Sequence, residues 1–147
     1  MRVAILGSGS WATALAKIVM HNASEINWYI RKQETIDEFI QTRRNPNHLE
    51  WAYFDVSCIH FSADINFTIN QSDLIIVAIP SPYLKEIFNE ITVDMSKKII
   101  ISAVKGMMPD SNILVTDFLH QHFQIPENQL GMITGPCHAE EIAFERL

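Results

Sequence analysis

The stretch Val3-Ala4-Ile5-Leu6-Gly7-Ser8-Gly9-Ser10-Trp11-Ala12 combines a short apolar run with a glycine-rich turn. Gly-x-Gly-x-x-Ala directly after a strand and before a helix is the pattern of a dinucleotide-binding turn. Gly7 permits a tight turn, and Gly9 has no Cβ, so the backbone can approach a pyrophosphate closely. Ala12 is small enough for the helix to pack on the strand. The pattern predicts a pyrophosphate on the free N–H groups at the helix N-terminus.

Apolar runs of strand length alternate with longer amphipathic segments along the rest of the chain. We expect strands at residues 2–6, 26–30, 74–79, 98–103 and 130–134, and short extended pieces at 58–61 and 66–69. We expect helices at residues 10–21, 33–42, 83–91, 111–123 and 137–146. This alternation predicts an α/β fold of Rossmann type, with a doubly wound, mainly parallel sheet and three layers, α/β/α. Ligands of such sheets bind outside the carboxyl ends of the strands.

Length, charge and cysteine usage exclude several classes of protein. The 147 residues predict one domain, which buries roughly 70% of its unfolded surface and needs neither disulfide nor metal to fold. The net charge of −6 argues against nucleic acid or an anionic membrane as the main partner. Cys58 and Cys137 are expected to be reduced thiols. The longest apolar run has six residues, so we expect no membrane insertion and a cytoplasmic location.

A basic tip, Tyr29-Ile30-Arg31-Lys32, follows the second expected strand. A site that prefers NAD usually carries Asp or Glu at this position, to bind the ribose 2′-hydroxyl. The two cations instead suit a 2′-phosphate, or a guanidinium stacked on adenine. A solvated basic turn is the alternative. The tip leaves the choice between NADH and NADPH open, with NADPH expected to be accepted.

Two later strand ends carry candidate site residues. Lys105-Gly106 follows one of them, and a lysine at the mouth of a parallel sheet can hold a phosphate or a carbonyl oxygen. Gly135-Pro136-Cys137-His138 follows the other, where free N–H groups at a helix start can meet a ligand. His138 can be a general acid or base, but a helix-start residue facing solvent or the cofactor pocket is the simpler interpretation. The remaining histidines have no spacing typical of metal ligands, so no metal is expected; they are His21, His48, His60, His120 and His122.

Four blocks of this chain together resemble the N-terminal domain of NAD(P)-dependent glycerol-3-phosphate dehydrogenases, over essentially the whole length. The blocks are Gly7–Ala16, Ala78-Ile79-Pro80-Ser81, Ser102-Ala103-Val104-Lys105-Gly106 and Gly135–Ala143. The resemblance implies reversible reduction of dihydroxyacetone phosphate to sn-glycerol 3-phosphate with NAD(P)H, in glycerophospholipid synthesis. Besides Gly7, Gly9 and Ala12 of the turn, it implies cofactor contacts from Ser10, Trp11, Arg31, Lys32, Lys105 and Ala139. It implies substrate contacts from Lys105, Gly135 and Cys137.

The chain departs from the family pattern at several positions. Ala12 stands at a usual glycine, Cys137 at a usual serine or threonine, and His138 at a usual aromatic residue. His48-Leu49-Glu50-Trp51 stands where Tyr-Leu-Pro-Gly is usual. The resemblance also implies that the general-acid lysine belongs to a helical C-terminal substrate domain, which this chain lacks. We therefore expect residues 1–147 to be the dinucleotide-binding domain of a longer, homodimeric protein, with no catalytic residue of its own, weak NAD(P)H binding and no turnover.

Two other functions are also compatible with the sequence. Another NAD(P)-dependent reductase, of hydroxyacid or ketopantoate type, shares the glycine-rich turn but lacks the pairing of Gly-Ser-Trp with Val-Lys-Gly-Met. A non-catalytic dinucleotide-sensing module also shares the turn. A helical domain with a lysine-bearing site in the complete gene favours the enzyme, whereas a DNA-binding or channel domain favours the sensor.

Overall fold

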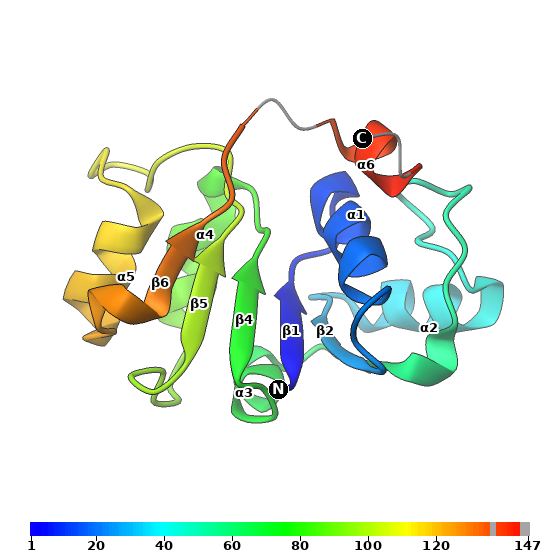
Figure 1. The fold of residues 1–147 in the computed structure, drawn as a ribbon, viewed down its shortest axis with the longest axis horizontal. Coiled ribbons are helices and arrows are strands. Elements are labelled where there is room, and N and C mark those ends of the chain that lie inside the picture. The colour runs from blue at the N-terminus through cyan, green and yellow to red at the C-terminus, as the bar shows by residue number, and fades with distance from the viewer. Residues whose placement is uncertain (136–137, 145–147) are drawn as a thin grey trace.

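A parallel sheet of six strands forms the centre of the computed structural model, which describes residues 1–135 and 138–144 (Figure 1). The strands are β1 Val3–Leu6, β2 Ile26–Tyr29, β3 Ile59–Ser62, β4 Leu74–Val77, β5 Ile99–Ser102 and β6 Leu130–Met132. They lie in the order β3-β2-β1-β4-β5-β6. The order reverses between β1 and β4, and this reversal is the switch point of a doubly wound fold. The predicted fold class is confirmed.

Helices cover both faces of the sheet. They are α1 Ser10–Val19, α2 Gln33–Thr42, α3 Ile65–Asn70, α4 Ser81–Asn89, α5 Val115–Phe123 and α6 Ala139–Ala143. Buried side chains of α1, α2 and α6 share one core cluster with the sheet, and those of α3, α4 and α5 share another. Figure 1 shows α6 lying beside α1, above the carboxyl ends of the strands. None of the helices in the described ranges is both long and apolar enough to cross a membrane.

The central strands are apolar because the sheet is covered on both sides. Val3 and Ile5 of β1 pack toward α1 and α2, while Ala4 and Leu6 pack toward α3 and α4. In register, Val3 of β1 stands between Ile26 of β2 and Leu74 of β4. The glycine turn that follows Leu6 therefore lies at the end of a central strand, between the ends of β2 and β4.

An aromatic cluster fixes the half of the sheet next to the turn. Trp28 lies with ring centroids 5.2 Å from Phe39 and 5.6 Å from Phe54, and it stacks on Phe61 at 5.8 Å. Phe54 belongs to the irregular segment 43–57, which this contact ties to the sheet. The indole N–H of Trp28 also donates to the carbonyl of Gly7 at 2.7 Å. Trp28 thus connects the aromatic cluster to the glycine turn.

The structure differs from the expected elements by a few residues at several ends, and the largest differences lie at residues 66–69 and at the start of α5. Residues 66–69, expected as extended, belong to helix α3. The Asp64 side chain accepts hydrogen bonds from the backbone N–H groups of Asn66 and Phe67 and so caps this helix, whose Ile65, Thr68 and Ile69 are buried at helical spacing. Helix α5 begins at Val115 rather than at 111, because Asp110 and Asn112 adopt left-handed backbone angles, φ +67° and +52°, that interrupt a helix.

Candidate functional site

Gly7 stands where the switch point is most crowded. Its φ is +122°, a conformation that side chains disfavour, and a Cβ on it would lie 2.5 Å from the carbonyl oxygen of Ala78, just beyond β4. Its N–H donates to the carbonyl of Tyr29 at 3.2 Å. Only glycine fits here, because the chain turns away from β1 while it touches the strand ends on both sides.

The N-terminus of α1 is open to a ligand. Gly9 is its N-cap and supplies no side-chain hydrogen bond, and the first turn carries no acidic residue. A Cβ on Gly9 would meet no atom within 4 Å, so the free side of this residue faces open space. Ala12, one turn on, is fully buried against the core. The uncapped N–H groups and the helix dipole together suit an anion such as a pyrophosphate.

A buried asparagine supports the turn from the opposite side. Asn45 is fully buried, and its side-chain amide donates to the carbonyl of Ser8 at 2.9 Å and to Thr13 Oγ1 at 2.7 Å. The Thr13 hydroxyl donates in turn to the carbonyl of Gly9 at 2.9 Å. No local sequence pattern marks Asn45 as a site residue, because it lies in the irregular segment 43–57 and is 37 residues away from Ser8 along the chain. The three side-chain bonds hold the glycine turn in place.

A groove of about 540 Å³ runs past the turn on the β2 side. It is lined by Gly7, Ser8, Gly9, Tyr29, Ile30, Arg31, Lys32, Thr35, Asn47, His48, Ile79, Pro80, Tyr83 and Ile87. One wall is His48, whose Nδ1 lies 3.2 Å from the Ser10 hydroxyl. Another wall is Tyr83 of α4, whose half-exposed ring joins the apolar Ile79 and Pro80. The groove combines a flat apolar side with the basic tip of β2, as a site for a nucleoside phosphate does.

The basic tip is not a free pair of cations. Arg31 forms an ion pair with Glu86 of α4, with Nη2 and Oε1 2.7 Å apart. Lys32 is exposed at the N-cap of α2. Burial raises the pKa of the Tyr29 hydroxyl beside this tip; the carboxylates of Glu90, Asp64 and Glu86 add to the rise, and Arg31 opposes it. The tip therefore contains both cations and carboxylates.

A second pocket, of about 350 Å³, lies on the β5 and β6 side of the turn. It is lined by Trp11, Val104, Lys105, Gly106, Met132, Ile133, Thr134 and Gly135. The indole N–H of Trp11 donates to the carbonyl of Ala103 at 2.8 Å, and the Lys105 ammonium lies 5.1 Å from the centre of the Trp11 ring. The structure thus brings together Trp11, Lys105 and Gly135, three predicted site residues from separate segments of the chain.

Two further residues singled out from the sequence, His138 and Ala139, lie at the start of α6. Ala139 is the first residue of this helix and packs partly buried on the α1 side of the core. His138 is its exposed N-cap. Cys137 lies outside the described residues. Ala139 is thereby held beside α1, because α6 packs against α1.

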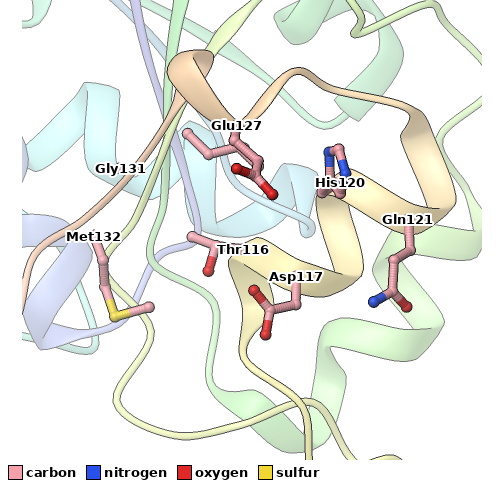
Figure 2. A pocket seen from close by; sticks show the side chains of 8 residues that line it. Thr116, Asp117, His120, Gln121, Glu127, Gly131 and Met132 are labelled. Atoms are coloured by element: carbon pink, nitrogen blue, oxygen red, sulfur yellow. The ribbon is translucent and has the colours of Figure 1, made fainter.

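A pocket of about 370 Å³ between α5 and β6 contains none of the predicted cofactor or substrate residues (Figure 2). Thr116, Asp117 and His120 of α5 line it together with Glu127 and Met132. Its two carboxylates disfavour a phosphorylated ligand. Across residues 1–135 and 138–144, no three His, Cys, Asp or Glu side chains form a group that could hold a metal ion.

The glycine turn at the switch point of a doubly wound parallel sheet assigns the chain to the Rossmann-type dinucleotide-binding domains. Residues 2–147 match the family described as the N-terminus of NAD-dependent glycerol-3-phosphate dehydrogenase, and the chain belongs to this family. The resemblance stated from four sequence blocks is confirmed, and neither alternative function is favoured.

Relatives of known name agree with this assignment. Glycerol-3-phosphate dehydrogenase (NAD(P)+) of Oceanobacillus iheyensis is 31% identical over 145 residues, which are 97% of this chain and 41% of that protein. The enzyme of the same name from Staphylococcus carnosus is 30% identical over 147 residues, covering 99% and 44%. The solved glycerol-3-phosphate dehydrogenase of Plasmodium falciparum superposes with a TM-score of 0.84 at 27% identity, covering 99% of this chain and 43% of that one. The chain spans about two fifths of the length of these relatives.

Proposed function

We propose that this chain is the dinucleotide-binding part of a protein that interconverts dihydroxyacetone phosphate and sn-glycerol 3-phosphate with NAD(P)H, in glycerophospholipid synthesis. The observation that carries the proposal is the uncapped N-terminus of α1 at Gly9, with the basic groove on one side and the Lys105 pocket on the other. Membership of the family supports the reaction.

The residues present fit a dinucleotide. The open side of Gly9 and the N–H groups of the first turn of α1, including those of Ser10 and Trp11, would hold the pyrophosphate. Arg31 and Lys32 would contact the adenosine half, and the apolar wall at Pro80 and Tyr83 suits an adenine ring. Trp11, Lys105 and Ala139 would contact the nicotinamide half.

The second pocket would receive the substrate next to the cofactor. When bound, the reduced nicotinamide supplies the hydride. The Lys105 ammonium, placed over the Trp11 ring, would bind the phosphate or the carbonyl oxygen of the substrate, with Gly135 and Cys137 completing the contacts. A lysine of a helical C-terminal domain, which would follow residues 1–147 in the whole protein, would donate the proton. Residues 1–147 then bind and orient but provide no general acid.

The setting proposed for the whole protein is a homodimer in the cytoplasm that acts on a small phosphorylated substrate. The presence of only two cysteines supports a reducing compartment, and the charge of −6 supports a small-molecule partner rather than nucleic acid. The dimer rests on the family alone.

Calorimetric titration of the chain with NADH and NADPH tests the binding proposal. We expect weak binding of both, and Arg31→Ala should weaken NADPH about tenfold more than NADH, because a guanidinium recognises a 2′-phosphate by charge-assisted hydrogen bonds. Equal losses for both would mean that the guanidinium stacks on adenine. Arg44→Ala is the matched control, because Arg44 lies over the Tyr53 ring and does not line the groove.

An activity assay tests the division of labour. The 147-residue chain should not oxidise NADH in the presence of dihydroxyacetone phosphate, whereas the complete gene product should. Turnover by the isolated chain would contradict the proposed location of the general acid.

A further inference from the structure

A carboxylate from α4 reaches the tip of β2 in three dimensions, although the sequence places none there. Glu86 lies one turn after Tyr83 on α4, and its Oε1 is 2.7 Å from Nη2 of Arg31. Tyr83 and Arg31 both line the groove. The ion pair therefore joins the tip of β2 to α4 beside the groove, at the position where a ribose 2′ substituent would meet Arg31.

Other carboxylates act on the same end of the groove. Tyr29 is nearly fully buried there. Burial and the carboxylates of Glu90, Asp64 and Glu86 raise the pKa of its hydroxyl, and Arg31 lowers it. These three carboxylates therefore lie close enough to the Tyr29 hydroxyl to affect its pKa, and one of them, Glu86, also contacts Arg31. An added dianionic group would enter a region where the Arg31 guanidinium already has a carboxylate partner.

We propose that Glu86 is a specificity-determining residue, which by holding Arg31 disfavours cofactors with a 2′-phosphate relative to those with a 2′-hydroxyl. The inference rests on the proposed function, namely that this groove receives the adenosine half of the dinucleotide. A 2′-phosphate must either take Arg31 from Glu86 or lie beside the Glu86 carboxylate, and both cost free energy. A ribose hydroxyl is neutral and meets neither cost.

The size of the effect follows from the exposure of the pair. Arg31 and Glu86 keep 55% and 54% of their side-chain surface exposed, so water and salt screen the interaction. We therefore expect a change in preference of about fivefold rather than a thousandfold. Both side chains can be replaced without opening the core, so variants should keep their fold.

The decisive measurement is the ratio of NADPH to NADH dissociation constants for the wild type and Glu86→Gln at low ionic strength. Glu86→Gln should tighten NADPH binding about fivefold and change NADH binding less than twofold. The gain should shrink at high salt. The gain should also vanish in an Arg31→Ala background, because Glu86 is proposed to act through Arg31. The two single variants and the double variant form a double-mutant cycle that measures this coupling.

Glu90→Gln is the matched control, since it removes one negative charge close to the same helix but no contact with Arg31. It should shift the ratio by less than half as much as Glu86→Gln. An unchanged ratio in Glu86→Gln, or a weaker affinity for NADPH, would overturn the inference; the second result would mean that Glu86 positions Arg31 for the phosphate. If the folded wild type binds neither nucleotide, the proposed function fails and this inference with it, whereas NADH binding with an unchanged ratio refutes the role of Glu86 alone.

Discussion

Trp11 and Lys105, 94 positions apart in the chain, meet at the mouth of the sheet, with the ammonium 5.1 Å from the centre of the indole ring. The same indole donates its N–H to the carbonyl of Ala103. One side chain of the glycine turn therefore fixes the end of β5 and supports the lysine proposed to bind substrate. A cation over an aromatic face is stabilised by the ring, so Trp11 helps to fix the position of the Lys105 ammonium.

Trp11→Phe should lower the free energy of unfolding by about 1 kcal/mol, because it keeps an aromatic face but leaves the Ala103 carbonyl without its donor. Urea denaturation followed by circular dichroism measures the change. Trp51→Phe is the control, since Trp51 is 40% exposed and stacks on Phe144, so its loss should be smaller. Equal losses in the two variants would contradict a structural role for the Trp11 hydrogen bond.

Gly7→Ala and Gly9→Ala should separate folding from binding. Gly7→Ala should cost at least about 3 kcal/mol, because its Cβ would lie 2.5 Å from the Ala78 carbonyl oxygen at a disfavoured φ. Gly9→Ala meets no atom and should cost at most about 1 kcal/mol as an N-cap change. Its NADH affinity should nevertheless fall at least about tenfold, because the methyl group would occupy the proposed pyrophosphate site.

Thermal unfolding and calorimetric titration of both glycine variants provide the test. A Gly9→Ala variant that binds NADH as tightly as the wild type would place the pyrophosphate elsewhere. A Gly7→Ala variant of normal stability would contradict the close approach of the turn to β4.

Asn45→Ala should lower both stability and cofactor affinity. It removes two buried donors, to Ser8 and Thr13, and should cost about 2 kcal/mol of unfolding free energy. The NADH dissociation constant should rise, because the glycine turn loses its side-chain support. Asn22→Ala, at an exposed position after α1, is the control and should leave both quantities close to the wild type. Loss of stability without loss of affinity would restrict Asn45 to a folding role.

Acid should weaken the fold partly through Asp73. The backbone N–H of Arg2 donates to Asp73 Oδ2 at 2.8 Å and, with the nearby guanidinium, lowers the pKa of this carboxyl group. Because the pKa is lower in the folded state, the stabilisation is present above the unfolded pKa of about 4 and is lost as the pH falls through the folded value.

Urea midpoints between pH 7 and pH 2 measure this contribution. Asp73→Asn should be less stable than the wild type at pH 7, and the difference should shrink as the pH falls below about 4. Glu38→Gln, which removes an exposed carboxylate of α2, controls for the general effect of charge. A constant difference between Asp73→Asn and the wild type at all pH values would contradict the assignment.

Much of the fold and part of the site follow from local patterns. The glycine turn at Gly7 and Gly9, the strand β1 before it and the bounds of α2 can be predicted from the sequence, because apolar periodicity and glycine placement act over a few residues. The same patterns give the wrong prediction at α3. The mixed polarity of residues 66–69 predicts an extended segment, whereas Asp64 caps a helix there.

The partners of the site residues depend on packing between distant segments. Trp11 donates a hydrogen bond to Ala103, and Asn45 donates one to Ser8. Arg31 pairs with Glu86, which is 55 residues away in the chain. No local pattern contains these contacts, because the order of strands around the switch point brings the segments together only after the sheet has formed. The sequence at the tip of β2 shows two adjacent cations, Arg31 and Lys32, and no carboxylate. In the folded chain, the Glu86 carboxylate of α4 forms an ion pair with Arg31.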